Sequence, residues 1–416
     1  MQIRPEDQIV LDHVAARRDV LIGRAVDWAN INSGSRNADG LDRVLTAIEQ
    51  SVEALPCSVE RVATAASSRI EDDGTEVPLS FAPALKLTLR PDAPIQIVLT
   101  GHYDTVFDAD SPFQTVRTRD DGALHGPGIA DMKGGISVLL GALEAFELHA
   151  DKARVGWSVL LSPDEEIGSP GSAPLLADMG ARGHLGLTYE PSLPDGSLAG
   201  ARKGSGNFHI VVRGKSAHAG RAYHEGVNAI AGAARLASAL DALNGQREGV
   251  TVNVAKISGG SALNVVADTA IVRFNVRVPD PEAAEWTRAQ IQDLTSRSPI
   301  EGATVHLHGG FTRPPKPMDA AQTELFEAVR QAGELLNQTL RWQPSGGVCE
   351  GNNLHAAGLP NIDTLGVIGG AIHSEQEYAW PNSFVERAQL SALILCKVAS
   401  GEIDALRLKQ LRLQSR

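Results

Sequence analysis

The sequence predicts an α/β protein: a mixed central sheet flanked by helices, with a smaller α+β unit inserted into the chain. Apolar runs at 95–100, 155–161 and 184–189 have the length and composition of strands buried on both faces. The apolar segment 134–148 lies between the first two runs and is long enough for a buried helix. Such an alternation of strands and helices is typical of layered α/β domains.

A change in the order of predicted strands and helices in the second half of the chain predicts the inserted unit. Residues 191–206 are rich in Pro, Gly and Ser, and TRPPKP at 312–317 marks a second boundary. Between them the patterns follow the order β-α-β-β-α-β, which fits a split βαβ sandwich. We therefore assign residues 1–203 and 318–416 to one domain and 204–317 to an inserted lid domain. Its sheet would be antiparallel and would offer edges for dimerisation.

Further elements follow from the same periodicities. A helix is expected at 41–54, where apolar side chains share one face. The inserted unit is expected to contain strands at 207–213, 250–258, 267–278 and 303–308 and helices at 226–243 and 282–298. After the second boundary we expect helices at 320–337 and 383–400 and a strand at 361–367.

Composition narrows the class of protein. The 416 residues are 43% hydrophobic and 21% charged, as in ordinary soluble proteins, and the formal charge is -12. An acidic chain without a basic stripe disfavours nucleic-acid and anionic-membrane partners. Three scattered cysteines give neither a disulfide framework nor a thiolate zinc site. No signal peptide or membrane-spanning run is apparent, so we expect a cytoplasmic protein.

Acidic and histidine residues gather in five short motifs, each after a predicted strand or in a glycine-rich loop beside one. Open α/β sheets bind ligands outside the carboxyl ends of their strands, so these residues could meet in one crevice. The motifs are TGHYDTV with His102 and Asp104, GPGIADMKGG with Asp131, SPDEEIGS with Glu165 and Glu166, TYEPS with Glu190, and GGAIHSEQE with His373.

The residue types in these motifs favour a metal centre. Histidines and carboxylates without cysteine suit zinc or another borderline divalent ion. Two imidazoles and three carboxylates are too many for one tetrahedral ion with an open position, and they suit two ions bridged by a carboxylate. Asp104 lies two residues after His102 and can accept a hydrogen bond from its ring. Glu165 and Glu166 alone would favour a solvated acidic turn; beside the other motifs, one can bind metal while the other faces the substrate.

Several stretches in order along the chain carry a resemblance: GHYDTV, GPGIADMKGG, SPDEEIGS, EPS, GKSAHAG, ISGGSALNVV and SGGVCEGNN with GGAIHS. Taken together, they resemble the co-catalytic dinuclear zinc peptidase family, which contains aminoacylases, acetylornithine and succinyl-diaminopimelate deacylases, and glutamate carboxypeptidases. The resemblance runs from about residue 30 to 400 and is most marked toward the bacterial glutamate carboxypeptidases. It implies the zinc-peptidase type of central sheet with an inserted dimerisation domain.

The resemblance also implies roles for the motif residues. His102 and Glu190 would complete one zinc site, Glu166 and His373 the other, and Asp131 would bridge the two ions, followed by a cis peptide bond. Two Zn²⁺ per chain are expected, with Co²⁺ or Mn²⁺ as possible substitutes. Glu165 would be the general base, which takes a proton from the metal-bridged water and passes one to the leaving amine.

Residues of the inserted unit and its neighbours are expected to complete the site. By resemblance, His218 reaches the active site of a second copy in a homodimer and stabilises the oxyanion. Asn264 and Arg277 hold the substrate, Arg277 by gripping its carboxylate. Gly347 lies in a loop that approaches the substrate closely.

The expected reaction is cleavage of the amide bond of an N-acyl or peptidyl amino acid with a free carboxylate. Glu350 stands where relatives of the folate-trimming enzymes usually have Asp, which puts glutamate specificity in question. Alternatives on the same centre are a carbamoyl or ureido amidohydrolase, an N-acyl-amino-acid deacetylase, or a relative that binds its ligand without catalysis. Cys349 lacks the His–Asn arrangement of a thiol nucleophile. The glycine-rich loop lacks the phosphate-binding patterns.

Overall fold

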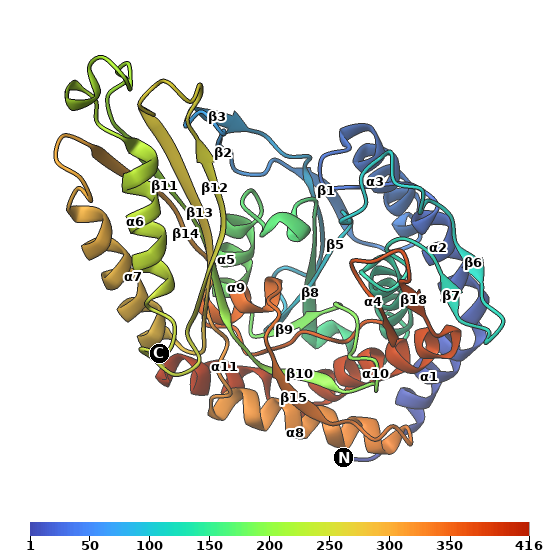
Figure 1. Ribbon diagram of the computed structural model, residues 1–416. Coiled ribbons are helices and arrows are strands. Elements are labelled where there is room, and N and C mark those ends of the chain that lie inside the picture. Colours follow the sequence, from blue (N-terminus) through green and yellow to red (C-terminus); the bar gives the residue numbers. More distant parts are fainter. Residues whose placement is uncertain (416) are drawn as a thin grey trace.

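A six-stranded mixed sheet forms the centre of the computed structural model, which describes residues 1–415 (Figure 1). Its order is β1-β4-β8-β5-β9-β16. The strands β5, β8, β9 and β16 run parallel, and β1 and β4 add antiparallel pairs at one side. The bounds are β1 Ser58–Val62, β4 Ala84–Leu89, β5 Ile95–His102, β8 Val155–Ser162, β9 Leu185–Thr188 and β16 Asn361–Ile362. This confirms the predicted α/β class with a mixed central sheet.

Helices cover both faces of this sheet, which explains the continuous apolar runs of its strands. Ile97 and Leu99 of β5 belong to the core shared with the N-terminal helices and α10, whereas Val98 packs with α5 and α9 on the opposite face. Alternate residues of a strand point to opposite faces, so both sets must be apolar. The helices are α1 Pro5–Ala16, α2 Arg18–Ala29, α3 Ala38–Val52, α4 Lys133–Phe146, α5 Ala173–Arg182, α8 Ala320–Leu335, α9 Glu350–Ala356, α10 Pro381–Ser400 and α11 Ala405–Gln414.

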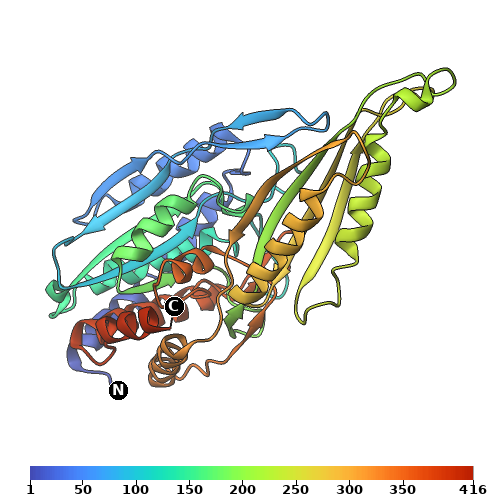
Figure 2. The same ribbon diagram turned by 90° about the vertical axis from the view of Figure 1, so that its left-hand side faces the viewer.

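A second, four-stranded sheet forms the inserted unit, here called the small unit (residues 204–313). Its order is β12-β13-β11-β14, and all its neighbouring strands are antiparallel, as predicted. Helices α6 and α7 pack on one face only (Figure 2). The elements are β11 Gly204–Arg213, α6 Ala229–Asp241, β12 Thr251–Gly259, β13 Thr269–Val278, α7 Pro281–Ser296 and β14 Thr304–Arg313. The exact domain boundaries stay a prediction.

Three segments differ from the sequence prediction. Strand β14 continues to Arg313, past the expected end at 308. The stretch interpreted as a boundary contains β10 Leu198–Arg202, which pairs in parallel with β15 Trp342–Ser345. The expected strand at 361–367 is wrong beyond Ile362, because the chain crosses the end of β9: the amide of Gly366 donates to the carbonyl of Glu190.

A hairpin from the larger unit reaches across to the small unit. Strands β2 (Ser67–Ile70) and β3 (Glu76–Leu79) form it, and Figure 1 shows it beside the upper part of β12 and β13. Ile70 forms a small apolar cluster with Val211 and Ile271 on the helix-free face of the small unit's sheet. Asp72 at the hairpin turn forms ion pairs with side chains of β12 and β13. The hairpin therefore braces the two units against each other.

Within residues 1–415, no helix combines the length and the hydrophobicity that crossing a bilayer requires.

Candidate metal centre

The carboxyl ends of β5, β8 and β9 lie at one edge of the central sheet, because these strands are parallel. His102 is the last residue of β5. Glu165 and Glu166 occupy a short 3-10 turn (Glu165–Ile167) just after β8, and Glu190 follows β9. The structure thus gathers at this edge the acidic and histidine side chains expected from the motifs, as open α/β sheets do with their ligand sites.

Loops supply the other two expected ligands. Asp131 precedes α4, and the peptide bond between Asp131 and Met132 is cis, as expected. His373 follows the short strand β17 (Gly369–Gly370), which pairs with β18 (Tyr378–Ala379). This strand pair continues into β7 (Leu124–His125) and β6 (Arg117–Thr118), so the His373 loop lies next to the Asp131 loop.

Asp131 lies between the two histidines and divides the cluster into two halves. Its Oδ1 is 3.1 Å from His102 Nε2, and its Oδ2 is 3.2 Å from His373 Nε2. On the first side Glu190 Oε1 lies 3.8 Å from His102 Nε2, and on the second Glu166 Oε2 lies 3.1 Å from His373 Nε2. Two groups of three donors, each with its ligand atoms within 4.8 Å, therefore share one aspartate.

The electrostatics of this cluster favour a cation. Burial, and next the nearby Asp131 carboxylate, raise the pKa of Glu166 to about 8. Burial also raises the pKa of Glu190 well above its usual value, and its Oε1 has no hydrogen-bond partner. Buried carboxylates that repel one another are stabilised when a divalent ion supplies positive charge, and such an ion would also give the free oxygen of Glu190 a partner.

Asp104 connects His102 to the acidic turn. His102 Nδ1 lies 3.0 Å from the main-chain carbonyl oxygen of Asp104 and 3.3 Å from its carboxylate Oδ1. The amides of Glu165 and Glu166 each donate to this carboxylate over 3.2 Å. The closer contact of the ring is therefore with the carbonyl, whereas we expected the carboxylate. The orienting role of Asp104 stays a prediction.

Glu377 is a residue that the sequence reasoning missed. Its carboxylate is fully buried and accepts hydrogen bonds from the amides of Gly128, Ala130 and Asp131 at 3.1, 2.9 and 3.0 Å. It thereby fixes the backbone that carries Asp131. The available signal was its place in the same GGAIHSEQE motif as His373.

A cavity of about 350 Å³ opens beside the cluster, between the two units. Its lining includes Glu165, Glu166 and His373 of the cluster, together with Arg277 and Gly347. Arg277 is half-buried, and its Nε donates to Asn275 over 3.0 Å. Its Nη1 is buried without a hydrogen-bond partner, and burial lowers its pKa. Such a guanidinium has donors free for an anionic ligand.

His218 and Asn264 lie together but outside this cavity. Both are exposed in loops of the small unit, where the amide of Ala219 donates to the carbonyl of Asn264 over 2.9 Å. His218 forms a β-bridge with Val265. A single chain therefore does not bring these two residues into the lining of the cavity described above.

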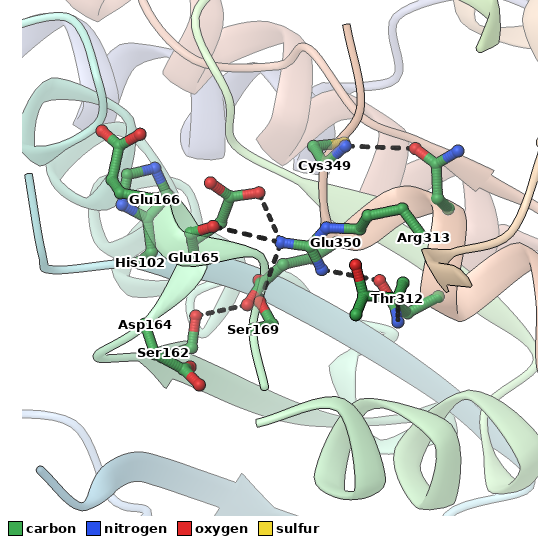
Figure 3. A network of polar contacts seen from close by, with 12 residues as sticks. His102, Ser162, Asp164, Glu165, Glu166, Ser169, Thr312, Arg313, Cys349 and Glu350 are labelled. Carbon is green, nitrogen blue, oxygen red and sulfur yellow. Dashed lines mark hydrogen bonds and ion pairs between the residues drawn. The ribbon is translucent and has the colours of Figure 1, made fainter. Parts of the chain in front are cut away.

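Arg313 is the second residue that the sequence reasoning missed, because it stands in the Pro-rich segment interpreted as a boundary. Its guanidinium is buried and points at Glu165 (Figure 3). Nη2 lies 2.6 Å from Glu165 Oε1 and 2.8 Å from Ser169 Oγ, and Nη1 lies 2.6 Å from Asn353 Oδ1. No signal in the sequence distinguished this arginine from the prolines around it.

Glu350 lies behind this contact, fully buried (Figure 3). Its Oε1 accepts a hydrogen bond from Ser162 Oγ, and its Oε2 has no hydrogen-bond partner. Burial raises the pKa of Glu350 to about 8, although the charge of Arg313 opposes this effect. The residue that departs from the family pattern thus belongs to the wall behind Glu165 and does not line the cavity.

The fold and the shared-aspartate cluster define a class of α/β proteins with a candidate two-ion centre. The chain belongs to peptidase family M20/M25/M40, whose model matches residues 98–397, and it is therefore a hydrolase. This confirms the resemblance found in the motifs.

Individual relatives cover most of the chain. Carboxypeptidase G2 of Pseudomonas sp. (strain RS-16) is 24% identical over 95% of this chain and 93% of its own length. Succinyl-diaminopimelate desuccinylase of Methylobacterium radiotolerans is 32% identical over 68% of this chain and 75% of its own length. A Bacillus subtilis structure, described as a dinuclear metal-binding peptidase of family M20, superposes with a TM-score of 0.61 at 18% identity and covers 93% of this chain and 99% of that one.

Proposed function

We propose that this chain is a dinuclear metallohydrolase that cleaves the amide bond of an N-acyl or peptidyl amino acid carrying a free carboxylate. The observation that carries the proposal is the position of Asp131, with one carboxylate oxygen beside each histidine. A carboxylate shared in this way is what a pair of ions about 3.5–4 Å apart requires.

The donor set fits zinc. His102, Asp131 and Glu190 would hold one ion, and Asp131, Glu166 and His373 the other. Nitrogen and carboxylate donors without thiolates suit Zn²⁺, and also Co²⁺ or Mn²⁺. The unpartnered Glu190 Oε1 is a buried acceptor that a cation would satisfy. When bound, such ions polarise a carbonyl oxygen and lower the pKa of water.

Glu165 is the proposed general base. Its side chain is 11% exposed and lines the cavity next to Glu166, so it can reach both a substrate and the cluster. It would take a proton from the attacking water and deliver one to the nitrogen of the leaving amine. Arg313 contacts one oxygen of Glu165, Oε1, and no described contact joins Glu165 to a histidine of the cluster. The other carboxylate oxygen is therefore available for this transfer.

Arg277 is the residue proposed to bind the free carboxylate of the substrate. Its planar guanidinium can donate two parallel hydrogen bonds to a carboxylate, and Nη1 has no partner of its own. Asn275 fixes its Nε, which leaves the outer nitrogens directed at a ligand. Gly347 also lines the cavity, and its carbonyl accepts from Arg202 over 3.2 Å.

His218 and Asn264 would reach the site of a second copy in a homodimer. Their exposure in loops away from their own chain's cavity supports this arrangement. Relatives named as a carboxypeptidase and as a succinyl-diaminopimelate desuccinylase support a substrate range from peptides to acylated amino acids. A cytoplasmic location remains a prediction from the sequence alone.

The proposal is tested by metal analysis together with a substrate panel. We expect about two zinc ions per chain and chelator-sensitive hydrolysis of at least one class among N-acyl amino acids, dipeptides, folyl-glutamate and N-carbamoyl amino acids. Glu165→Gln should keep its metal and lose turnover by a factor of about 10² or more. Full activity of metal-free protein, or binding of every substrate without hydrolysis by the zinc-loaded protein, would reject the proposal.

A further inference from the structure

We propose that Arg313 is a positioning residue for the general base: it holds the Glu165 carboxylate in the orientation for proton transfer and couples that orientation to the small unit. The inference rests on the proposed function, in which Glu165 is the base. Arg313 would act through Glu165 and not on the substrate itself.

The guanidinium is fixed independently of Glu165. Asn353 Oδ1 accepts from Nη1 over 2.6 Å, and the amide nitrogen of Asn353 donates to the carbonyl of Thr312 over 3.1 Å. The second hydrogen bond fixes the orientation of the side-chain amide, so that its oxygen faces Arg313. Ser169 Oγ accepts from Nη2 over 2.8 Å. Because the planar guanidinium offers its donors in a fixed fork, these two contacts determine where the second N–H of Nη2 points.

Glu165 lies where this second N–H of Nη2 points. Nη2 reaches Glu165 Oε1 over 2.6 Å and comes within 3.4 Å of the main-chain carbonyl of the same residue. Within the described residues no hydrogen bond or ion pair involves Glu165 Oε2, and Glu165 lines the cavity, so this second oxygen is the one left to face the cavity. One oxygen is thus held while the other stays available to a proton.

Charge balance points to the same pairing. Arg313 is 1% exposed, and a buried cation of this kind requires a counter-charge. Glu350 is a second carboxyl group near it, but Arg313 has no hydrogen bond to Glu350, and burial raises the pKa of Glu350 to about 8, which favours its neutral form. Glu165 is then the carboxylate that neutralises Arg313.

The contact also crosses between the two units. Arg313 is the last residue of β14 and is paired with Ser205 of β11, so its backbone belongs to the sheet of the small unit. Glu165 belongs to the turn after β8 in the central sheet. Any shift of the small unit therefore moves the group that holds the base.

The test uses the full-length zinc-loaded enzyme and the best substrate of the panel. We expect Arg313→Ala to lower kcat about 100-fold with KM within about threefold, because general-base catalysis contributes 10²–10⁴-fold. Added guanidinium chloride should restore kcat about tenfold by refilling the vacated site, and sodium chloride at equal concentration should not. Zinc content should equal that of the unchanged protein.

Arg387→Ala is the matched control. Arg387 is also buried, at 2% exposure, but its Nη2 donates to the carbonyl of Gly196 away from the cavity. This variant should lose stability, keep its kcat and show no rescue by guanidinium. Rescue in both variants would mean a general effect of the salt and would overturn the inference.

Asn353→Ala keeps the inference testable if Arg313→Ala does not fold. It removes the Nη1 partner and the hydrogen bond to the carbonyl of Thr312 but leaves Arg313 in place, and it should lower kcat about fivefold at unchanged KM and zinc content, as expected for a misaligned base. Unchanged kcat in folded Arg313→Ala or Asn353→Ala overturns the inference. Absence of chelator-sensitive hydrolysis in the unchanged protein instead rejects the proposed function, so the two failures are distinguishable.

Discussion

The hydroxyl of Ser35 donates a hydrogen bond to Oδ2 of Asp104 over 2.7 Å. Ser35 lies in the loop between α2 and α3, where Gly34 forms a β-bridge with Thr105. Asp104 in turn contacts His102 and accepts from the amides of Glu165 and Glu166. The N-terminal helices thus reach the candidate metal centre through one serine, although none of them contributes a candidate ligand.

Ser35→Ala should therefore weaken metal binding. Loss of the hydroxyl leaves Asp104 with one partner fewer and frees it to shift away from His102. Loss of a group that supports a metal ligand typically costs 10–100-fold in metal affinity, and we expect about tenfold here. Competition with a fluorescent zinc chelator measures the change. Ser51→Ala, which removes a hydroxyl bonded only within α3, is the control and should leave zinc affinity unchanged.

Glu377→Gln should loosen the loop that carries Asp131. The carboxylate now accepts three amide hydrogens, whereas a glutamine side chain offers one oxygen and turns an NH₂ group toward donors. An unsatisfied buried donor costs about 1–3 kcal/mol. We expect a lower urea midpoint and a faster loss of zinc to chelator. Equal rates of zinc loss in the variant and the unchanged protein would show that the loop is held by other contacts.

His355 should make the folded state sensitive to acid. Its side chain is buried; burial and the nearby charge of Arg412 lower its pKa to about 4, and the contact with Asp319 opposes them only in part. The unfolded chain takes up the proton near pH 6.5, so stability falls between pH 6.5 and pH 4. The loss is about 3 kcal/mol at most. Urea unfolding at a series of pH values should show this decline, and His355→Gln should remove much of it.

Two glycine substitutions should shift stability in opposite directions. A Cβ at Gly23, inside α2, meets no atom within 4 Å, so Gly23→Ala should stabilise the helix by about 0.5–1 kcal/mol. A Cβ at Gly135 of α4 would lie 2.0 Å from the carbonyl oxygen of Tyr189. Gly135→Ala should cost about 2 kcal/mol or more, because backbone has to move. It should also lower zinc content, since Tyr189 precedes Glu190; thermal unfolding and metal analysis measure both effects.

The sequence predicted the central sheet because its strands are buried on both faces. Ile97, Val98 and Leu99 all had to be apolar, and that continuous run is visible without a structure. The same logic placed His102 and Glu190 at strand ends, where the structure brings them within 3.8 Å of each other. Periodicity and position along the chain carried this part of the prediction.

Contacts between distant segments escaped the same reasoning. Arg313 stands among prolines that signal a linker, and its meaning depends on Asn353 and Ser169, which only the folded chain brings near. Glu377 acts on backbone amides about 250 residues earlier in the chain. Pairings of this kind leave no periodic pattern; Glu377 could be suspected from its place in the motif of His373, whereas nothing in the sequence marks Arg313.

The hairpin of β2 and β3 contacts the small unit in addition to the two covalent connections and the pair of Arg313 with Glu165. We expect this contact to restrain rocking of the small unit and thereby the width of the cavity beside Arg277. The contact of the hairpin is partly ionic and exposed, since the side chain of Asp72 is 60% exposed where it pairs with Lys256 and Arg273. Exposed pairs weaken as salt screens them. A higher ionic strength should therefore loosen this contact and ease the entry of a bulky substrate, with little effect on a small one.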